Sequence, residues 1–246
     1  MTATTKDIPF QRTAALELAD KLLKERGALL QAGTGVGKTY ITAQALKQVI
    51  PTLLKSEAPD TPFPILWIGP AATMIQTQRV LKSYGIAQYV MTLSYSALTS
   101  PKTGGAMFYQ TRTEVTYGQE QIVYDWRECM LPRLVVFDEC QALKNEESTR
   151  TAIARGLPEN VKRLFISATP YQRVCEARTV MVGVGMRSEY NVLPLSQGTA
   201  PSVMRSLATY GNTSAYSPRA MEKVKGVMQP YTVNVKGIRF KHKART

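Results

Sequence analysis

The sequence predicts an α/β domain in which a parallel β-sheet is covered by helices on both faces. Short apolar runs alternate along the chain with longer segments whose apolar residues recur at helical spacing. Runs such as 134–137 (LVVF) are continuously apolar, which is typical of strands buried on both faces. The composition agrees, because 44% hydrophobic and 20% charged residues are ordinary for a protein with an extensive core.

The elements follow one another in a regular order. Helices are expected at 11–26, 40–50 and 74–84, strands at 28–30, 65–68, 90–93, 134–137 and 163–167, and a polar surface loop at 55–64. The second helix is expected to stop at Pro51, because proline lacks an N–H and clashes with the preceding turn. Between Ser100 and Trp126 polar and apolar residues alternate around Gly118, which predicts an exposed hairpin inserted between core elements. Residues 228–236 are expected to provide the closing strand.

A glycine-rich loop, AGTGVGKT, lies between the first predicted strand and the second predicted helix. Gly33, Gly35 and Gly37 lack Cβ atoms, so the backbone can bend sharply and bring its N–H groups against phosphate oxygens. Lys38 supplies charge for the β- and γ-phosphates at a helix N-terminus, and the Thr39 hydroxyl can ligate Mg²⁺. The sequence therefore predicts ATP and Mg²⁺ as cofactors. The predicted nucleotide-binding residues here are Ala32, Gly33, Thr34, Gly35, Val36, Gly37, Lys38 and Thr39.

An acidic pair, Asp138 and Glu139, directly follows the apolar run 134–137. Ligands of open α/β sheets bind at this end of the strands. We expect Asp138 to hold Mg²⁺ and Glu139 to orient and polarise the attacking water. Acidic residues after a strand also cap helices, so the catalytic interpretation depends on the glycine loop being present. With Lys38, these two carboxylates are the predicted catalytic residues.

The three segments AGTGVGKT, DECQ (138–141) and SAT (167–169) resemble motifs I, II and III of superfamily 2 helicases and translocases in order and spacing. Residues 134–170 look particularly like the Swi/Snf-type branch, in which a Lys-Asn pair, here at 144–145, follows the acidic motif. The resemblance implies a RecA-like P-loop lobe over residues 1–172. It also implies that Gln141, Ser167 and Thr169 couple hydrolysis to movement, although hydroxyls at a strand end can equally be caps.

Weaker similarities extend the site. Gln11, in Phe10-Gln11, lies where the family has an upstream glutamine that reads the adenine edge through its amide. Residues 69–73 are similar to a segment that contacts the nucleic-acid backbone, which implies a contact at Thr73. A strand-ending Gly-Pro turn explains this segment equally well. Residues 92–95 resemble the next backbone-contacting segment, with the same alternative.

The net charge of +13 favours a polyanionic partner, because a field of that sign attracts nucleic acid. The C-terminal part is the most basic, and its end interleaves an aromatic residue with cations (VKGIRFKHKART). We expect nucleic-acid contacts there, at Lys236, Arg239, Lys241 and Lys243. The alternative is a solvated terminus. The Swi/Snf-like similarity favours DNA over RNA as the partner.

Superfamily 2 motors enclose ATP between two RecA-like lobes, and the second lobe supplies an arginine finger. Residues 170–246 contain no Q-x-x-G-R-x-x-R pattern and are too few for a second lobe. We expect residues 173–246 to complete the first lobe, to lead toward a missing second lobe, or both. An arginine finger contributes about 10³- to 10⁵-fold in rate. The chain alone is therefore expected to hydrolyse ATP weakly, with a second lobe in a longer chain or another subunit.

The favoured function is the ATP-binding lobe of a DNA-dependent ATPase, helicase or translocase. The alternative is a nucleotide-gated, nucleic-acid-binding accessory subunit with little or no turnover. A small-molecule kinase is disfavoured by the DECQ and SAT segments and by the absence of a recognisable acceptor motif or lid.

Other classes of protein are excluded by composition. No apolar run approaches the roughly 20 residues that cross a bilayer, and the N-terminus has no apolar core of a signal peptide. Three cysteines without a CxxC pair and a single histidine give almost no material for a zinc site or disulfide framework. We therefore expect an intracellular protein, cytoplasmic or associated with a nucleoid or nucleus, with no membrane partner.

Overall fold

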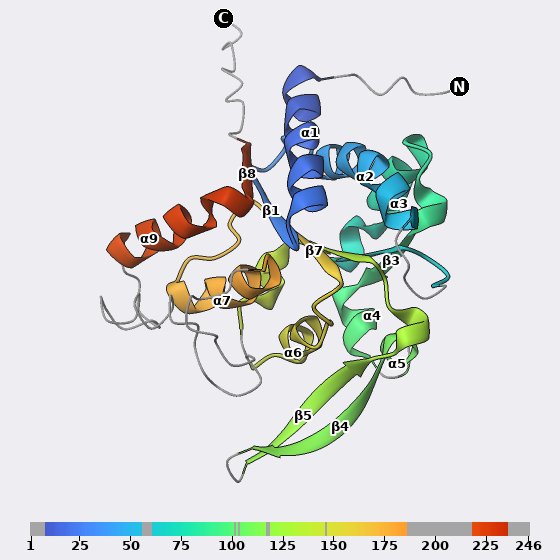
Figure 1. Ribbon diagram of the computed structural model, residues 1–246, viewed down its shortest axis with the longest axis vertical. Helices are drawn as coiled ribbons and strands as arrows, with labels where there is room; N and C mark the ends of the chain where they lie inside the picture. Colours follow the sequence, from blue (N-terminus) through green and yellow to red (C-terminus); the bar gives the residue numbers. More distant parts are fainter. Residues whose placement is uncertain are drawn as a thin grey trace, which may run out of the picture.

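Six parallel strands form the central sheet of the computed structural model, which Figure 1 shows surrounded by helices. Their order is β3-β2-β6-β7-β1-β8. The structure describes residues 8–55, 61–100, 102, 104–116, 119–145, 147–185 and 218–235. The strands of the sheet are β1 (Gly27–Ala32), β2 (Ile65–Gly69), β3 (Val90–Ser94), β6 (Leu134–Asp138), β7 (Lys162–Ser167) and β8 (Thr232–Val235). The predicted α/β class with a parallel sheet is confirmed, and each predicted strand is present. The closing strand is shorter than predicted, because residues 228–231 belong to the end of a helix and a 3-10 turn.

Helices cover both faces of the sheet, as the continuously apolar strands predict. One face carries α1 (Pro9–Lys24), α2 (Lys38–Lys55) and α3 (Met74–Ser83). The other carries α4 (Tyr95–Thr99), α5 (Gly105–Phe108), α6 (Thr149–Arg155), α7 (Val174–Gly183) and α9 (Pro218–Met228). Side chains alternate between the two layers, so Val135 and Phe137 join one core while Leu134 and Val136 join the other.

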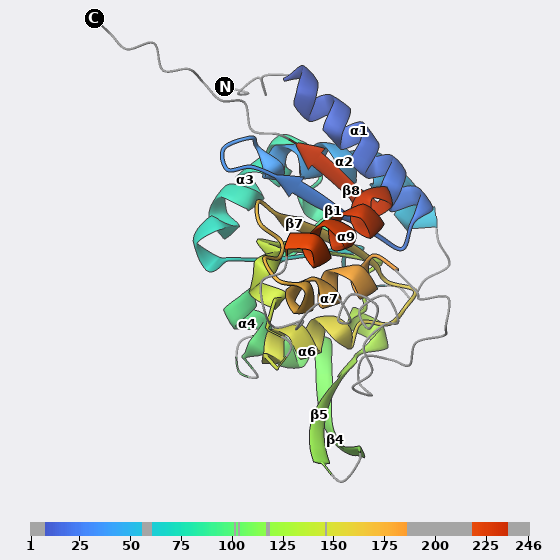
Figure 2. The same cartoon turned by 90° about the vertical axis from the view of Figure 1, so that its left-hand side faces the viewer.

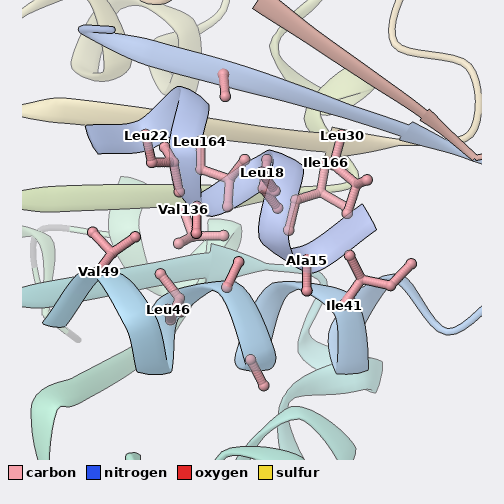
Figure 3. Packing of buried hydrophobic residues seen from close by; sticks show 14 of the residues in the cluster. Ala15, Leu18, Leu22, Leu30, Ile41, Leu46, Val49, Val136, Leu164 and Ile166 are labelled. Carbon is pink, nitrogen blue, oxygen red and sulfur yellow. The ribbon is translucent and has the colours of Figure 1, made fainter. Parts of the chain in front are cut away.

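The core between the sheet and helices α1 and α2 fixes the first layer (Figure 3). Leu18 of α1 and Leu46 of α2 are fully buried, together with Leu30, Leu164 and Ile166 of the central strands. Burying one such side chain stabilises the fold by about 1.5–3 kcal/mol. This layer therefore fixes the distance between the end of β1 and the start of α2, which the glycine loop connects.

The expected helix end at Pro51 is wrong, because α2 continues through this proline to Lys55. Pro51 lies on the exposed side of the helix, as does Lys47, whose carbonyl loses its usual N–H partner. That carbonyl can be solvated. Leu53 is buried beyond the proline, and its own carbonyl accepts a hydrogen bond from Arg133. Packing of this last turn thus outweighs the local cost of the proline.

A two-stranded antiparallel hairpin projects from the domain, as Figures 1 and 2 show. Its strands are β4 (Tyr109–Thr116) and β5 (Gln119–Trp126), which confirms the predicted insertion. Tyr109 and Trp126 pair at its base and are buried in the core, and the Trp126 indole donates to the Ile153 carbonyl. Near the tip, Val115 and Ile122 are exposed. The described part of the hairpin is therefore anchored to the core at its base.

The sheet is completed by β8, which runs parallel to β1 at the edge. Helices α7 and α9 and strand β8 all belong to this domain, so part of the segment after residue 173 contributes to the lobe. The remaining predicted role of that segment, a lead toward a second lobe, stays a prediction. Of the described helices, none combines the length and apolar character that crossing a membrane requires.

Candidate nucleotide-binding and catalytic site

The three predicted motifs lie together at the carboxyl edge of the sheet. Strand β1 ends at Ala32 and leads into the glycine loop, β6 ends at Asp138, and β7 ends at Ser167. These strands are neighbours, since β7 lies between β6 and β1 and pairs with both. Because all three strands are parallel, their C-terminal residues meet at one edge, where ligands of α/β sheets bind.

The glycine loop has the bent backbone that phosphate binding requires. Gly35 and Gly37 adopt positive φ angles of 78° and 83°, which residues with a Cβ rarely reach. Helix α2 begins at Lys38, so its N-terminal dipole points at the loop. Thr34 and Gly35 are exposed, while Val36 is buried beneath them. Val36 therefore anchors the loop in the core, while Thr34 and Gly35 face the solvent.

Gln11 lies against this loop and is itself buried. Its side-chain amide donates to the Val36 carbonyl at 2.9 Å. A Cβ atom added to Gly37 would lie 2.4 Å from the Gln11 nitrogen, so a glycine is needed for this contact. The structure therefore brings Gln11 to the glycine loop, beside the position at which a nucleotide is expected.

A chain of polar contacts joins the three motifs. The Lys38 ammonium lies 3.2 Å from Glu139 Oε1. Gln141 donates from Nε2 to Glu139 Oε2 at 2.8 Å, and the Ser167 hydroxyl donates to Gln141 Oε1 at 2.6 Å. Thr169 joins this chain of contacts through its backbone N–H, which donates to Ser167 Oγ at 3.0 Å. The Thr169 side chain is exposed. A displacement of any member therefore reaches the others through direct contacts.

Asp138 is a desolvated carboxylate. It is only 6% exposed, and burial, followed by the neighbouring Glu139 charge, raises its pKa to about 6, against the opposing effect of Lys38. Gly69 of the adjacent strand leaves room for it, since a Cβ there would lie 3.1 Å from Asp138 Cβ. A cation bound beside Asp138 would offset the free-energy cost of ionising this buried carboxylate.

These residues fit Mg²⁺, which in nucleotide sites takes oxygen ligands from one or two carboxylates and from substrate phosphates. Asp138 offers a carboxylate and Thr39, in the first turn of α2, offers a hydroxyl. Among the described residues no cluster of three His, Cys, Asp or Glu side chains could hold a metal. The described residues therefore offer only part of the ligands that Mg²⁺ needs at this site, and the phosphates of a bound nucleotide would provide others.

Glu139 has a strained backbone. Its φ and ψ angles are 51° and 55°, and among the described residues it is the one non-glycine residue with positive φ. Such a conformation costs on the order of 1–3 kcal/mol and persists where the surroundings enforce it. Here the Glu139 N–H donates to Asp138 Oδ1 at 3.0 Å, and the Tyr95 hydroxyl donates to the Asp138 carbonyl at 3.0 Å.

Tyr95 is a site residue that the sequence does not reveal as such. It is 5% exposed, and burial raises the pKa of its phenol well above the ordinary value. The Arg150 guanidinium lies 5.8 Å from the centre of its ring. Tyr95 belongs to the segment that resembles a backbone-contacting motif, and the sequence carries no signal for its hydrogen bond to Asp138.

The remaining predicted contacts are placed as follows. Thr73 lies after the end of β2 and donates its hydroxyl to the Pro70 carbonyl, as in a turn. Thr92 lies in β3, where it accepts a hydrogen bond from Gln78, and Ser94 caps α4. The predicted contacts Lys236, Arg239, Lys241 and Lys243 lie outside the described residues.

Comparison with known proteins agrees with this geometry. The DEAD/DEAH box helicase family matches residues 9–177, which include the glycine loop, the acidic pair and the SAT segment. The chain belongs to this family. The predicted relationship to superfamily 2 helicases is thereby confirmed, and membership of this helicase family implies the use of ATP.

A protein of Acanthamoeba polyphaga mimivirus named "Putative ATP-dependent RNA helicase" is 24% identical over 192 residues. The alignment covers 72% of this chain and 32% of the viral protein. This helicase-family chain thus spans about a third of the length of that relative.

Two solved structures share the fold. One is the Sulfolobus solfataricus SWI2/SNF2 ATPase core in complex with dsDNA, with a TM-score of 0.60, 14% identity and coverage of 93% of this chain and 44% of that one. The other is the same organism's SWI2/SNF2 ATPase core domain, with a TM-score of 0.59, 15% identity and coverage of 95% and 44%. The predicted RecA-like architecture is confirmed by this likeness.

Proposed function

We propose that this chain is the ATP-binding first lobe of a DNA-dependent ATPase of the helicase and translocase type. The observation that carries the proposal is the chain of contacts from Lys38 through Glu139 and Gln141 to Ser167. It links the phosphate-binding lysine, the catalytic carboxylate and the coupling serine across three strands. A domain that bound nucleotide without hydrolysing it would need the phosphate-binding lysine, but neither the carboxylate nor the serine.

The residues suggest how turnover begins. The glycine loop and Lys38 hold the phosphates, while Asp138 and the Thr39 hydroxyl hold Mg²⁺, which neutralises phosphate charge when bound. A phosphate beside Lys38 competes with Glu139 for the ammonium. Glu139 then becomes free to accept a hydrogen bond from the attacking water. The other oxygen of Glu139 remains hydrogen-bonded to Gln141. A movement of Glu139 away from Lys38 therefore also shifts Gln141 and its partner Ser167.

Two observations support nucleic acid, and DNA in particular, as the partner. The chain carries a net charge of +13, and the SWI2/SNF2 core that shares its fold was solved with dsDNA. The chain spans 44% of that core, so we propose that a second RecA-like lobe, in a longer chain or another subunit, is required for full activity. Translocation or remodelling of DNA belongs to that assembly.

The experiment that tests the proposal is ATP hydrolysis with duplex DNA, single-stranded DNA and RNA, each measured with and without an added second lobe. We expect slow hydrolysis by the chain alone, and stimulation by duplex DNA once a second lobe is present. Failure to bind Mg-ATP would overturn the proposal. Equal stimulation by RNA would overturn the preference for DNA and leave the ATPase assignment standing.

One observation favours the alternative, an accessory subunit that binds nucleotide and nucleic acid without turnover. Both carboxylate oxygens of Glu139 are engaged, one by Lys38 and one by Gln141. In this arrangement each oxygen already has one partner, so the carboxylate has fewer acceptor sites left for an attacking water. ATP-dependent DNA binding that persists with hydrolysis undetectable, even with a second lobe, would establish this function in place of the first.

A further inference from the structure

An exposed aromatic residue, Tyr40, lies directly beside the glycine loop. It follows Lys38 and Thr39 in the first turn of α2, and 36% of its surface is exposed. A Cβ atom on Gly37 would lie 2.4 Å from Gln11 Nε2 and 3.6 Å from Tyr40 Cδ2. The Tyr40 ring and the Gln11 amide therefore lie on the same side of Gly37, at the end of the loop next to α2.

Both side chains are held in place by further contacts. Tyr84 meets the Tyr40 ring edge to face, with ring centres 6.5 Å apart and an angle of 67° between the planes. The Tyr84 hydroxyl in turn accepts a hydrogen bond from Gln44 at 3.0 Å. Gln11 is fixed by its bond to the Val36 carbonyl. A surface prepared in this way loses little side-chain entropy when a flat ligand binds.

We infer that the Tyr40 ring is the surface on which the purine base of the bound nucleotide stacks, beside the Gln11 amide. The inference rests on the proposed nucleotide binding, which places the phosphates on the loop that ends beside these two residues. A nucleotide with its phosphates on that loop carries its base only a sugar away, within reach of Tyr40. Stacking on Tyr40 provides affinity for any base, and this contribution is separate from the base reading that the family resemblance implies for Gln11.

Single exposed tyrosines on helices are common, so position alone does not establish the role. The test compares a ligand that has a base with one that has none. Affinities of Tyr40→Leu, Tyr40→Phe and the unaltered chain are measured by calorimetry for ATP and for inorganic tripolyphosphate, each with Mg²⁺. Leu54→Ala is the matched control, because Leu54 is an exposed apolar residue at the far end of the same helix.

We expect Tyr40→Leu to weaken ATP binding by about 5- to 150-fold, the range that base stacking on an aromatic side chain provides. Tripolyphosphate affinity should stay within about twofold of the unaltered chain, since aromatic stacking acts on bases and leaves phosphates untouched. Tyr40→Phe, which keeps the ring, should bind ATP as the unaltered chain does. Leu54→Ala should leave both affinities unchanged.

Two results would overturn the inference while leaving nucleotide binding intact. One is Tyr40→Leu with unchanged ATP affinity. The other is an equal loss for ATP and tripolyphosphate, which would place the effect of Tyr40 on the loop and its phosphates. If the unaltered chain binds neither ligand, the proposed function itself fails and the stacking role of Tyr40 fails with it.

Discussion

The ammonium of Lys38 and the carboxylate of Glu139 form an ion pair of 3.2 Å across the edge of the sheet. Their side chains are 13% and 32% exposed, so the pair is partly shielded from water. In the proposed reaction both groups act on ATP, one on the phosphates and the other on water. The pair therefore holds the two proposed catalytic groups against each other.

Replacing Lys38 with alanine should abolish ATP binding without unfolding the domain. The lysine charge lies at the phosphate end of the glycine loop, where it serves the ligand. Lys47→Ala, an exposed lysine of the same helix, is the control and should bind ATP normally. Calorimetric titration gives the affinities, and circular dichroism verifies the fold. A folded Lys38→Ala protein with unchanged ATP affinity would refute the phosphate-binding role.

Glu139→Gln should retain Mg-ATP and lose the turnover of the parent protein. The amide preserves the size of the side chain and removes the carboxylate that polarises water. We expect at least a hundredfold loss, on the order of what general bases contribute. Phosphate release is measured in the presence of duplex DNA and a second lobe, with Glu147→Gln as a control in the exposed loop that follows. Turnover at the parent rate would show that another group is the base.

Asp138→Asn should stabilise the protein at pH 7 and have little effect at pH 4. The folded carboxyl ionises at about pH 6, whereas an unfolded aspartate ionises near pH 4. Between these values the folded state binds more protons, so stability falls as pH rises through the window. The asparagine advantage should approach about 3 kcal/mol above pH 6. Urea unfolding of both proteins at pH 4, 5, 6 and 7 measures it, and a pH-independent difference would contradict the prediction.

Nucleic-acid binding should weaken steeply with salt, because its basis is the net charge of +13. Neutralising Z duplex phosphates gives a log–log slope of about −0.9Z. Deleting residues 236–246 removes five lysines and arginines, so the slope should flatten and affinity should fall for all sequences alike. Fluorescence anisotropy at several salt concentrations provides both quantities.

The control for this deletion is Thr73→Ala, which changes the other predicted contact surface. An unchanged slope after the deletion would locate binding at residues 69–73 and 92–95. An affinity that does not depend on salt would contradict both locations, since neither offers another source of binding.

The sheet and the phosphate loop could be predicted because their signals are local. Residues 134–137 are apolar throughout, as strands buried on both faces require, and the loop is marked by Gly35 and Gly37. The failure at Pro51 has the opposite cause. The propensity of one residue was outweighed by the burial of Leu53 in the following turn.

The finer geometry of the site could not be predicted, since it depends on residues distant in sequence. The bond from Tyr95 to the Asp138 carbonyl requires the end of β3 to meet the end of β6, two strands that are not neighbours in the sheet. The left-handed backbone of Glu139 is likewise unexpected for a side chain with a Cβ. Only the assembled edge of the sheet enforces it.

The position of β1 in the sheet has a consequence for synthesis of the protein on the ribosome. This strand is made well before its two neighbours, which begin at Lys162 and Thr232. The emerging chain therefore carries the phosphate loop long before either strand that flanks its base exists. Sheets closed by such distant segments form slowly, and the exposed strand is open to wrong pairing until then. A bound nucleotide can stabilise the folding lobe only after β7 has been made, so the proposed ATP site forms well after its glycine loop has been translated.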